Sequence, residues 1–299
     1  MHFADALIEK VQKTSPIVVG LDPNFDLMPE YLIPKTSSQS AVKRALIAFS
    51  KIVIESTYDL VPAVKLQSAY YEQFGTAGID ALSEAIHMAK SKGLLVIMDG
   101  KRGDIGSTSM AYAKAYLQGS TILKNGTEIP SDLDVDCLTI SPFLGDDSLS
   151  PFVEIAVEKK KGLFLLVKTS NPGSKLFLDH DMNGKPVYHH LAELVTRLGT
   201  QSGAIGSSGY SCIGAVVGAT VSTIAKELRE LMPKSFILMP GVGAQGGEMG
   251  TVKSTFDANG NGTIIPISRG ITYLKNQDAI DEEGYSSGIR KNLESFLTF

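Results

Sequence analysis

The chain has 299 residues, of which 43% are hydrophobic, and its formal net charge is -4 at pH 7. A chain of this length can bury a large core in one or two domains. The mild negative charge argues against a nucleic-acid partner, because binding to a polyanion normally requires a basic patch. The sequence contains no run of 18 apolar residues, so it predicts no membrane span.

The N-terminal segment, residues 1–13, carries apolar residues spaced as on one face of a helix. It lacks the long apolar core of a signal peptide, so we expect a cytoplasmic protein. Cys137 and Cys212 lie inside apolar runs and are interpreted as buried thiols rather than as a disulfide or a metal pair. Since no Cys/His spacing typical of a metal site occurs, the sequence predicts no metal.

Eight short apolar runs, rich in β-branched residues, recur along the chain. Runs of this kind are typical of strands buried on both faces, as in a parallel sheet. In chain order they are Ile17–Leu21, Ala63–Leu66, Leu94–Met98, Cys137–Ile140, Leu163–Val167, Ile213–Val217, Phe236–Met239 and Ile264–Ile267.

Segments with a helical pattern separate these runs. They are Ala41–Tyr58, Gly78–Ser91, Ser109–Gln118, Asp147–Lys161, Pro186–Gly203, Val221–Leu231 and Gly247–Ala258, with one or two further helices over Ile271–Phe299. Eight strands alternating with helices predict an α/β protein with a (β/α)8 TIM barrel, and a doubly wound sheet is the alternative. No linker rich in Pro, Gly or Ser is present, so we expect one domain over residues 1–299. Residues 119–134 and 174–185 are expected to form long polar loops or insertions.

In such a barrel the active site is formed at the carboxyl ends of the strands. The most charged of these ends is residues 98–108, Met-Asp-Gly-Lys-Arg-Gly-Asp-Ile-Gly-Ser-Thr. Asp99 and Lys101 are two residues apart on an extended segment, so their side chains are expected to point the same way. Lys65, at the end of the second run, and Asp104 add one charge of each sign. A solvated surface loop with salt bridges is the alternative, but it does not account for the position at strand ends.

This set of charges suits decarboxylation without an electron sink. A fixed carboxylate beside a substrate carboxylate disfavours the charge of that group by repulsion. A neighbouring ammonium stabilises the carbanion that remains when carbon dioxide departs, and it can then protonate the carbanion. We therefore expect no cofactor.

A Gly-rich segment, residues 239–247, follows the seventh run, and Arg269 follows the eighth. The loops after these two strands are the usual phosphate site of the fold. Backbone amides at Gly243 and Gly246 can approach an anion closely, Gln245 can bridge phosphate and base, and Arg269 can grip phosphate with two hydrogen bonds. The glycines also match a dinucleotide-binding fingerprint, but that fingerprint belongs after a first strand, so we reject this interpretation. A tight Gly turn without a ligand remains the alternative.

Two further strand ends carry polar residues that can contact a ligand. Ser170, in Ser-Asn-Pro-Gly after the fifth run, can hydrogen-bond to the edge of a polar ring. Asp22, after the first run, can accept hydrogen bonds from ribose hydroxyls. Each of these two motifs is common in ordinary turns and loops. They therefore support a binding site only in combination with the charged and Gly-rich segments.

Taken together, these residues resemble the orotidine 5′-phosphate decarboxylase family, in particular its longer bacterial branch. The resemblance runs from Val18 to Gly270 and rests on the DGKRGDIGSTS loop, on Lys65 within PAVKLQ, and on PGVGAQGG. It implies that the substrate is orotidine 5′-phosphate and the product UMP, in the last step of de novo pyrimidine biosynthesis. It also implies a reaction without metal or cofactor.

The resemblance further implies how the charged residues act. The two lysines and two aspartates would form a charged chain, in which Lys101 donates the proton to C6 of the pyrimidine. Asp104, with Ile105 and Thr108, would reach into the site of the neighbouring subunit. The enzyme would therefore be a homodimer with shared active sites.

The remaining contacts implied by the resemblance are with the substrate itself. Asp22 would contact the ribose and Ser170 the pyrimidine. Gln245 and Arg269 would hold the phosphate, and the residues from Pro240 to Gln245 would belong to a closing lid.

Two other functions are compatible with the same barrel. One is a metal-dependent decarboxylase or aldolase of sugar phosphates, which places an acidic metal ligand near the second strand. This chain has Lys65 there, and an ammonium repels a divalent cation. The other is a non-catalytic barrel that binds a phosphorylated sugar, which would not need Lys101.

Overall fold

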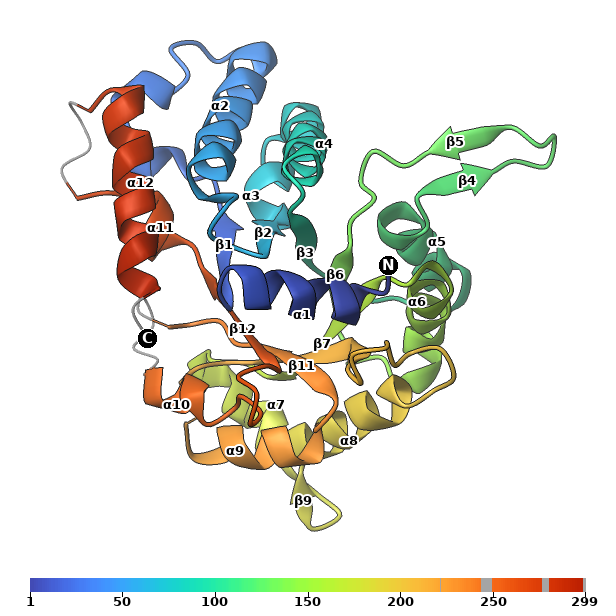
Figure 1. The fold of residues 1–299 in the computed structure, drawn as a ribbon. Coiled ribbons are helices and arrows are strands. Elements are labelled where there is room, and N and C mark those ends of the chain that lie inside the picture. The colour runs from blue at the N-terminus through green and yellow to red at the C-terminus, as the bar shows by residue number, and fades with distance from the viewer. Residues whose placement is uncertain (221, 243–248, 276–279, 298–299) are drawn as a thin grey trace.

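Eight parallel strands close into a barrel in the computed structural model, which describes residues 1–220, 222–242, 249–275 and 280–297. Each strand pairs with its neighbours in the chain order of the barrel strands, and the last pairs with the first (Figure 1). The strands are β1 (Ile17–Leu21), β2 (Ala63–Gln67), β3 (Leu95–Arg102), β6 (Cys137–Ile140), β7 (Gly162–Lys168), β10 (Ser211–Val217), β11 (Ser235–Leu238) and β12 (Thr263–Ile267). The predicted (β/α)8 barrel is confirmed, and the doubly wound alternative is wrong.

Burial on both faces explains why these strands are almost continuously apolar. Every residue of β1, β10 and β12 is buried, since one face of each strand meets the barrel interior and the other meets helices. Polar residues in such strands are therefore exceptional. Lys65, Asp99 and Thr139 are buried polar residues near the carboxyl ends of β2, β3 and β6, three strands that are neighbours in the barrel.

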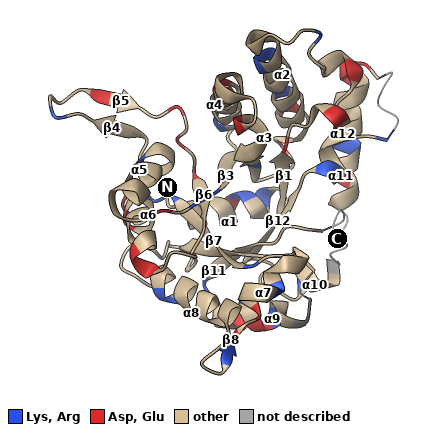
Figure 2. Cartoon of the chain, turned by 180° about the vertical axis from the view of Figure 1, so that it is seen from behind, with Lys and Arg blue, Asp and Glu red and all other residues tan. Residues whose placement is uncertain are grey.

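Helices cover the outside of the barrel, and Figure 2 shows residues of both charge signs interspersed along them. The described α-helices are α1 (Phe3–Lys13), α2 (Gln39–Thr57), α3 (Ser68–Glu72), α4 (Gly75–Ser91), α5 (Gly106–Leu117), α6 (Asp146–Lys159), α7 (Lys175–Leu178), α8 (Val187–Gly199), α9 (Ser222–Leu231), α10 (Met249–Lys253), α11 (Arg269–Thr272) and α12 (Glu282–Phe296). Three short 3-10 helices are η1 (Phe25–Leu27), η2 (Glu30–Leu32) and η3 (Pro172–Ser174). The helix predicted up to Ala258 ends at Lys253, and its predicted start lies outside the described residues. None of the described helices is long and apolar enough to cross a membrane.

Both predicted loop insertions contain a short antiparallel hairpin. The first pairs β4 (Ser120–Ile122) with β5 (Glu128–Pro130) and projects from the barrel (Figure 1). The second follows α7 and pairs β8 (Asp181–Met182) with β9 (Lys185–Pro186). An Asn-Gly pair lies at each turn, with Gly126 at φ 84° and Gly184 at φ 82°. Asn-Gly is the preferred sequence of tight hairpin turns, so this signal was present in the sequence.

Helix α1 closes the amino-terminal end of the barrel. Phe3 packs edge to face against Phe164, with ring centroids 6.3 Å apart, and its backbone N–H donates to the carbonyl of Lys160 at 2.9 Å. Gly162 permits this approach, because a Cβ there would lie 2.4 Å from the Phe3 ring. This contact of α1 lies at the end of the barrel opposite the carboxyl ends of the strands. It therefore contributes to stability and not to the chemistry of the site.

Phe3→Ala is expected to lower the free energy of unfolding by about 3–5 kcal/mol, because it leaves a cavity beside Phe164. Urea unfolding measures the loss, and catalytic rate is expected to stay unchanged. Phe177→Ala is the matched control, since Phe177 is 62% exposed and its loss should change stability by about 0.5 kcal/mol or less. An equal loss of unfolding free energy in the two variants would contradict a stabilising role for the packing of Phe3 against the barrel.

Candidate active site

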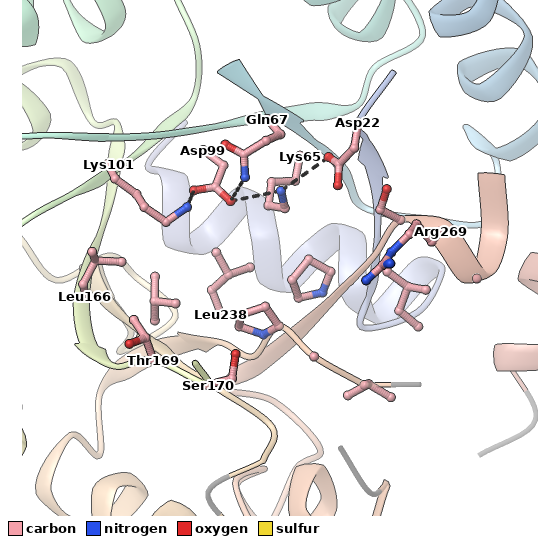
Figure 3. A pocket seen from close by; sticks show the side chains of 18 residues that line it. Asp22, Lys65, Gln67, Asp99, Lys101, Leu166, Thr169, Ser170, Leu238 and Arg269 are labelled. Atoms are coloured by element: carbon pink, nitrogen blue, oxygen red, sulfur yellow. Dashed lines mark hydrogen bonds and ion pairs between the residues drawn. The ribbon is translucent and has the colours of Figure 1, made fainter. Parts of the chain in front are cut away.

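A cavity of about 320 Å³ lies at the carboxyl ends of the barrel strands (Figure 3). It brings together side chains from β1, β2, β3, β7, β10, β11 and β12 or from the residues just after them. The predicted site residues that line it are Asp22, Lys65, Asp99, Lys101, Ser170, Pro240 and Arg269. Residues far apart in sequence therefore meet where the strand-end argument placed them.

Asp99 is the centre of the charged cluster. Its Oδ1 accepts hydrogen bonds from Lys101 Nζ at 2.7 Å and from Thr139 Oγ1 at 3.0 Å. Its Oδ2 lies 3.0 Å from Lys65 Nζ and accepts a hydrogen bond from Gln67 Nε2 at 3.0 Å. Both oxygens of a carboxylate that is only 9% exposed are thus bonded twice, which is the condition under which a buried charge is tolerated.

Burial and ion pairing act in opposite directions on the pKa values of this cluster. Burial by itself lowers the pKa of Lys65, but Asp99 and Asp22, the latter 3.8 Å away, outweigh it and raise that pKa to about 12. Burial by itself raises the pKa of Asp99, but the ammonium groups of Lys65 and Lys101 hold it well below its ordinary value of 3.8. Lys65 and Asp99 are therefore both charged at neutral pH.

The backbone around Lys101 differs from the extended geometry that the sequence predicts. Lys101 has a φ of 45°, and the pairing of β3 with β6 shifts register between Met98 and Arg102. This is a β-bulge, and the left-handed conformation costs a non-glycine residue about 1–2 kcal/mol. The side chains of Asp99 and Lys101 do meet, but through the bulge and not through simple strand alternation.

Arg102 holds the bulge from the outer side of the barrel. Its Nη1 donates to the carbonyl of Gly100 at 3.0 Å, and its Nη2 donates to the Tyr116 hydroxyl at 3.1 Å. Nη2 also pairs with the carboxylate of Glu72 in α3. Arg102 therefore ties the segment around Lys101 to α3 and α5, a role that the sequence alone did not indicate.

Ser170 reaches the cavity because the neighbouring strand comes close to it. A Cβ at Gly218 would lie 2.8 Å from Ser170 Cβ and 2.9 Å from its backbone nitrogen, so this packing requires glycine. Lys168, at the end of β7, is buried and pairs through Nζ with Asp179 Oδ1 at 2.5 Å. This ion pair ties the insertion that follows Ser170 to the barrel.

Arg269 lies across the cavity from Lys101, and Figure 3 shows the two on opposite sides. It is the first residue of α11, directly after β12, and Pro240 lines the cavity after β11. The guanidinium of Arg269 therefore faces the cavity at the end where the fold usually binds phosphate. The other predicted phosphate contacts, Gly243, Gln245 and Gly246, lie outside the described residues.

Three predicted residues of the signature loop do not line the described cavity of their own chain. Asp104 is half-buried, and its Oδ1 accepts a hydrogen bond from the backbone N–H of Ile105 at 2.8 Å. Ile105 is 60% exposed and Thr108 is also exposed. Asp104 and Ile105 directly precede α5, and Thr108 lies in its first turn.

Two residues that touch Asp99 were given no role from the sequence. Gln67 is the last residue of β2, so the strand-end rule indicated its position. Thr139 lies inside β6, within an apolar run, and is 1% exposed. A hydroxyl in a strand buried on both faces was the available signal for Thr139, since buried polar groups require partners.

The fold and the site together define a class of protein. It is a (β/α)8 barrel whose cavity holds a buried carboxylate between two ammonium groups at one end and an arginine at the other. Such an arrangement can bind a phosphorylated ligand and act on a carboxylate held beside the charged cluster.

Comparison with known proteins assigns the chain to a family within this class. The model of the orotidine 5'-phosphate decarboxylase / HUMPS family matches residues 15–282. The chain is 42% identical to the orotidine 5'-phosphate decarboxylase of Rhodopirellula baltica, over 97% of this chain and 96% of that protein. It is 38% identical to that of Caldicellulosiruptor bescii, over 99% and 98%. The chain therefore belongs to the orotidine 5'-phosphate decarboxylase / HUMPS family, and the resemblance seen in the sequence is confirmed.

A solved structure agrees with this assignment. The structure of Leishmania donovani OMP decarboxylase matches the chain with a TM-score of 0.71 and 27% sequence identity. The match covers 100% of both chains. The barrel and its helices are thus shared over the full length.

Asp99→Asn is expected to lower the free energy of unfolding at pH 7 by about 3–5 kcal/mol, because Lys65 keeps its buried charge and loses its nearest partner. The folded pKa of Asp99 is depressed, so its stabilisation is present above pH 3.8 and declines as the pH falls below that value. The difference between wild type and variant should therefore shrink by about 1 kcal/mol between pH 5 and pH 3.

Urea unfolding of both proteins across this range measures the difference. Glu158→Gln is the control, since Glu158 pairs with Lys159 at the surface and its effect should be near zero. A difference that stays constant down to pH 3 would show that the pKa of Asp99 is not depressed.

Proposed function

We propose that this chain decarboxylates orotidine 5′-phosphate to UMP through the Asp99 cluster. Support for the reaction comes from the family match and from relatives named orotidine 5'-phosphate decarboxylase at 42% and 38% identity. These findings support a carboxy-lyase of pyrimidine biosynthesis. The observation that carries the mechanism is the buried Asp99 carboxylate, bonded to Lys65 and Lys101 at the mouth of a cavity.

The proposed mechanism uses charges that are already fixed in the folded chain. The substrate carboxylate lies beside Asp99, and repulsion between the two carboxylates raises the energy of the bound substrate. The bond between C6 and the carboxylate breaks, carbon dioxide departs, and the electron pair stays on C6. The ammonium of Lys101 stabilises this pair and then transfers a proton from Nζ to C6, which gives UMP.

The rest of the cavity would supply binding energy and orientation. Arg269 binds the phosphate through charge-assisted hydrogen bonds, together with Gln245 and the amides of Gly243 and Gly246. Asp22 contacts the ribose, Ser170 contacts the pyrimidine, and Pro240 belongs to a lid. Binding energy gained at the phosphate is then available to hold the substrate carboxylate against Asp99.

We also propose that the enzyme is a homodimer in which Asp104 completes the site of the partner subunit. Asp104 and Thr108 lie outside the described cavity of their own chain, and Ile105 exposes 60% of its surface. The nearby Phe143 is 81% exposed. Apolar side chains this exposed beside a catalytic loop favour a protein–protein contact.

The organisation and location of the chain complete the proposal. We infer one domain over residues 1–299, because α1 closes the barrel and α12 packs against α2. A cytoplasmic location agrees with the two cysteines, Cys137 and Cys212, which are free and buried.

Lys101→Ala is expected to reduce UMP formation by about 10³-fold or more, because it removes the proton donor. Binding of UMP should survive, since Arg269 and the pyrimidine contacts are unchanged. The loss of substrate absorbance measures turnover, and Lys51→Ala, on the exposed face of α2, is the control lysine variant.

The same assay is run with excess chelator to test the metal-dependent alternative. Lys65 disfavours a divalent cation in the cavity, so wild-type turnover is expected to persist. Loss of turnover in chelator would favour the metal-dependent relatives. Full activity of Lys101→Ala would refute the proposed mechanism, and a folded wild type that binds UMP without turnover would favour a binding function.

Mixing two inactive variants tests the shared site. Lys101→Ala and Asp104→Asn are each expected to be inactive alone, because every site of either homodimer lacks one residue. A mixed dimer has one site with both residues intact, so random exchange should restore about one quarter of wild-type activity. If no activity returns although mass spectrometry detects mixed dimers, Asp104 acts within its own chain; full activity of Asp104→Asn alone would show that it has no role.

A further inference from the structure

The hydroxyl of Thr139 contacts both residues of the catalytic pair at once. Its Oγ1 accepts a hydrogen bond from the backbone N–H of Lys101 at 2.9 Å. The same oxygen donates to Asp99 Oδ1 at 3.0 Å, the carboxylate atom that Lys101 Nζ also contacts. A hydroxyl can donate one hydrogen bond and accept others, so a single atom satisfies both partners.

The bulge in β3 creates the need for this hydroxyl. Where a regular ladder continues, each backbone N–H donates to a carbonyl on one of the two neighbouring strands. At Lys101 the register with β6 is shifted, and its N–H bonds to the Thr139 side chain. Buried backbone donors without a partner are rare because they are costly, so the side chain here takes the place of a ladder carbonyl.

Thr139 is suited to hold a fixed geometry. It is 1% exposed and lies in β6, and its hydrogen bond to Asp99 is buried, so water has little access to the hydroxyl. Its branched Cβ restricts rotation of the side chain, which keeps the hydroxyl aimed at β3. It does not belong to the lining of the described cavity and therefore has no contact with a ligand there.

We propose that Thr139 is a positioning residue, which sets the orientation of the Lys101 ammonium relative to Asp99. The proposal rests on the proposed function, in which Lys101 protonates C6 of the substrate. Without the hydroxyl, the backbone N–H of Lys101 has no hydrogen-bond acceptor. Asp99 Oδ1 then accepts one hydrogen bond fewer. The bulge can then relax, and the ammonium is displaced from the reacting carbon.

This role affects the chemical step more than substrate binding. The groups proposed to bind phosphate and ribose, Arg269 and Asp22, lie on other strands and are unaffected by a change in β6. Thr139→Val keeps the branched shape and removes the hydroxyl. We expect it to lower kcat by about 10–100-fold, because a small misplacement of a catalytic group has an effect of this size. KM for orotidine 5′-phosphate should change by less than about threefold.

Thr139→Ser separates the hydroxyl from the packing. It restores both hydrogen bonds and loses one methyl group, so kcat should stay within about threefold of wild type. Thr263→Val is the matched control in the same barrel. Thr263 in β12 is also 1% exposed, and its hydroxyl bonds to Thr255, away from the cavity. This control should lose stability without a change in kcat.

Amide hydrogen exchange gives a readout that does not depend on turnover. Mass spectrometry of a peptide that contains Lys101 should show exchange about tenfold faster in Thr139→Val than in wild type, because the N–H has lost its acceptor. Thr263→Val should leave the exchange of that peptide unchanged.

The outcomes distinguish this proposal from the proposed function. If wild type does not convert orotidine 5′-phosphate, the proposed function fails, and the exchange data still decide whether Thr139 anchors the bulge. If wild type is active and Thr139→Val keeps kcat within about twofold, the positioning role is overturned. An equal loss of kcat in Thr139→Val and Thr139→Ser would also overturn the positioning role, since the loss would then come from changed packing.

Discussion

The structure of the site depends on one interaction, the pairing of the buried Asp99 carboxylate with Lys65 and Lys101. A carboxylate that is 9% exposed would take up a proton unless its charge were compensated. The compensation comes from two ammonium groups and two neutral donors, so four side chains converge on two oxygen atoms. Removal of any one of them leaves a buried charge or dipole with too few partners.

This convergence constrains three neighbouring strands. Lys65 and Gln67 come from β2, Asp99 and Lys101 from β3, and Thr139 from β6. Because adjacent parallel strands are in register, their carboxyl ends meet at one edge, and the bulge at Lys101 turns the ammonium back toward Asp99. The left-handed backbone there is an unfavourable local conformation, which persists because surrounding contacts over-determine it. Lys160 and Asn183 also have positive φ, but they lie in turns outside the cavity, whereas Lys101 lies within a barrel strand.

The sequence predicts the barrel and most of the cavity, because both follow from periodicity. Eight buried runs specify eight strands, and the strand-end rule then selects Asp22, Lys65 and Asp99 without any knowledge of distances. The bulge could not be predicted, since it depends on one backbone dihedral angle and on a shift in pairing. The roles of Arg102 and Thr139 follow from the bulge and were missed with it. The place of Asp104 also could not be derived, because its proposed target lies on a second subunit.

The charges in the cavity are arranged as a decarboxylation without an electron sink would require. The carboxylates of Asp22 and Asp99 balance the ammonium groups of Lys65 and Lys101 before a substrate enters. In the proposed function, a substrate carboxylate would add one negative charge next to Asp99, where that charge is least favourable. In the proposed mechanism, loss of carbon dioxide moves the charge to C6, and a proton from Lys101 neutralises it. The protein charges do not have to reorganise before the proton transfer, because folding has already fixed them, and fixed charges stabilise a transition state at no further cost.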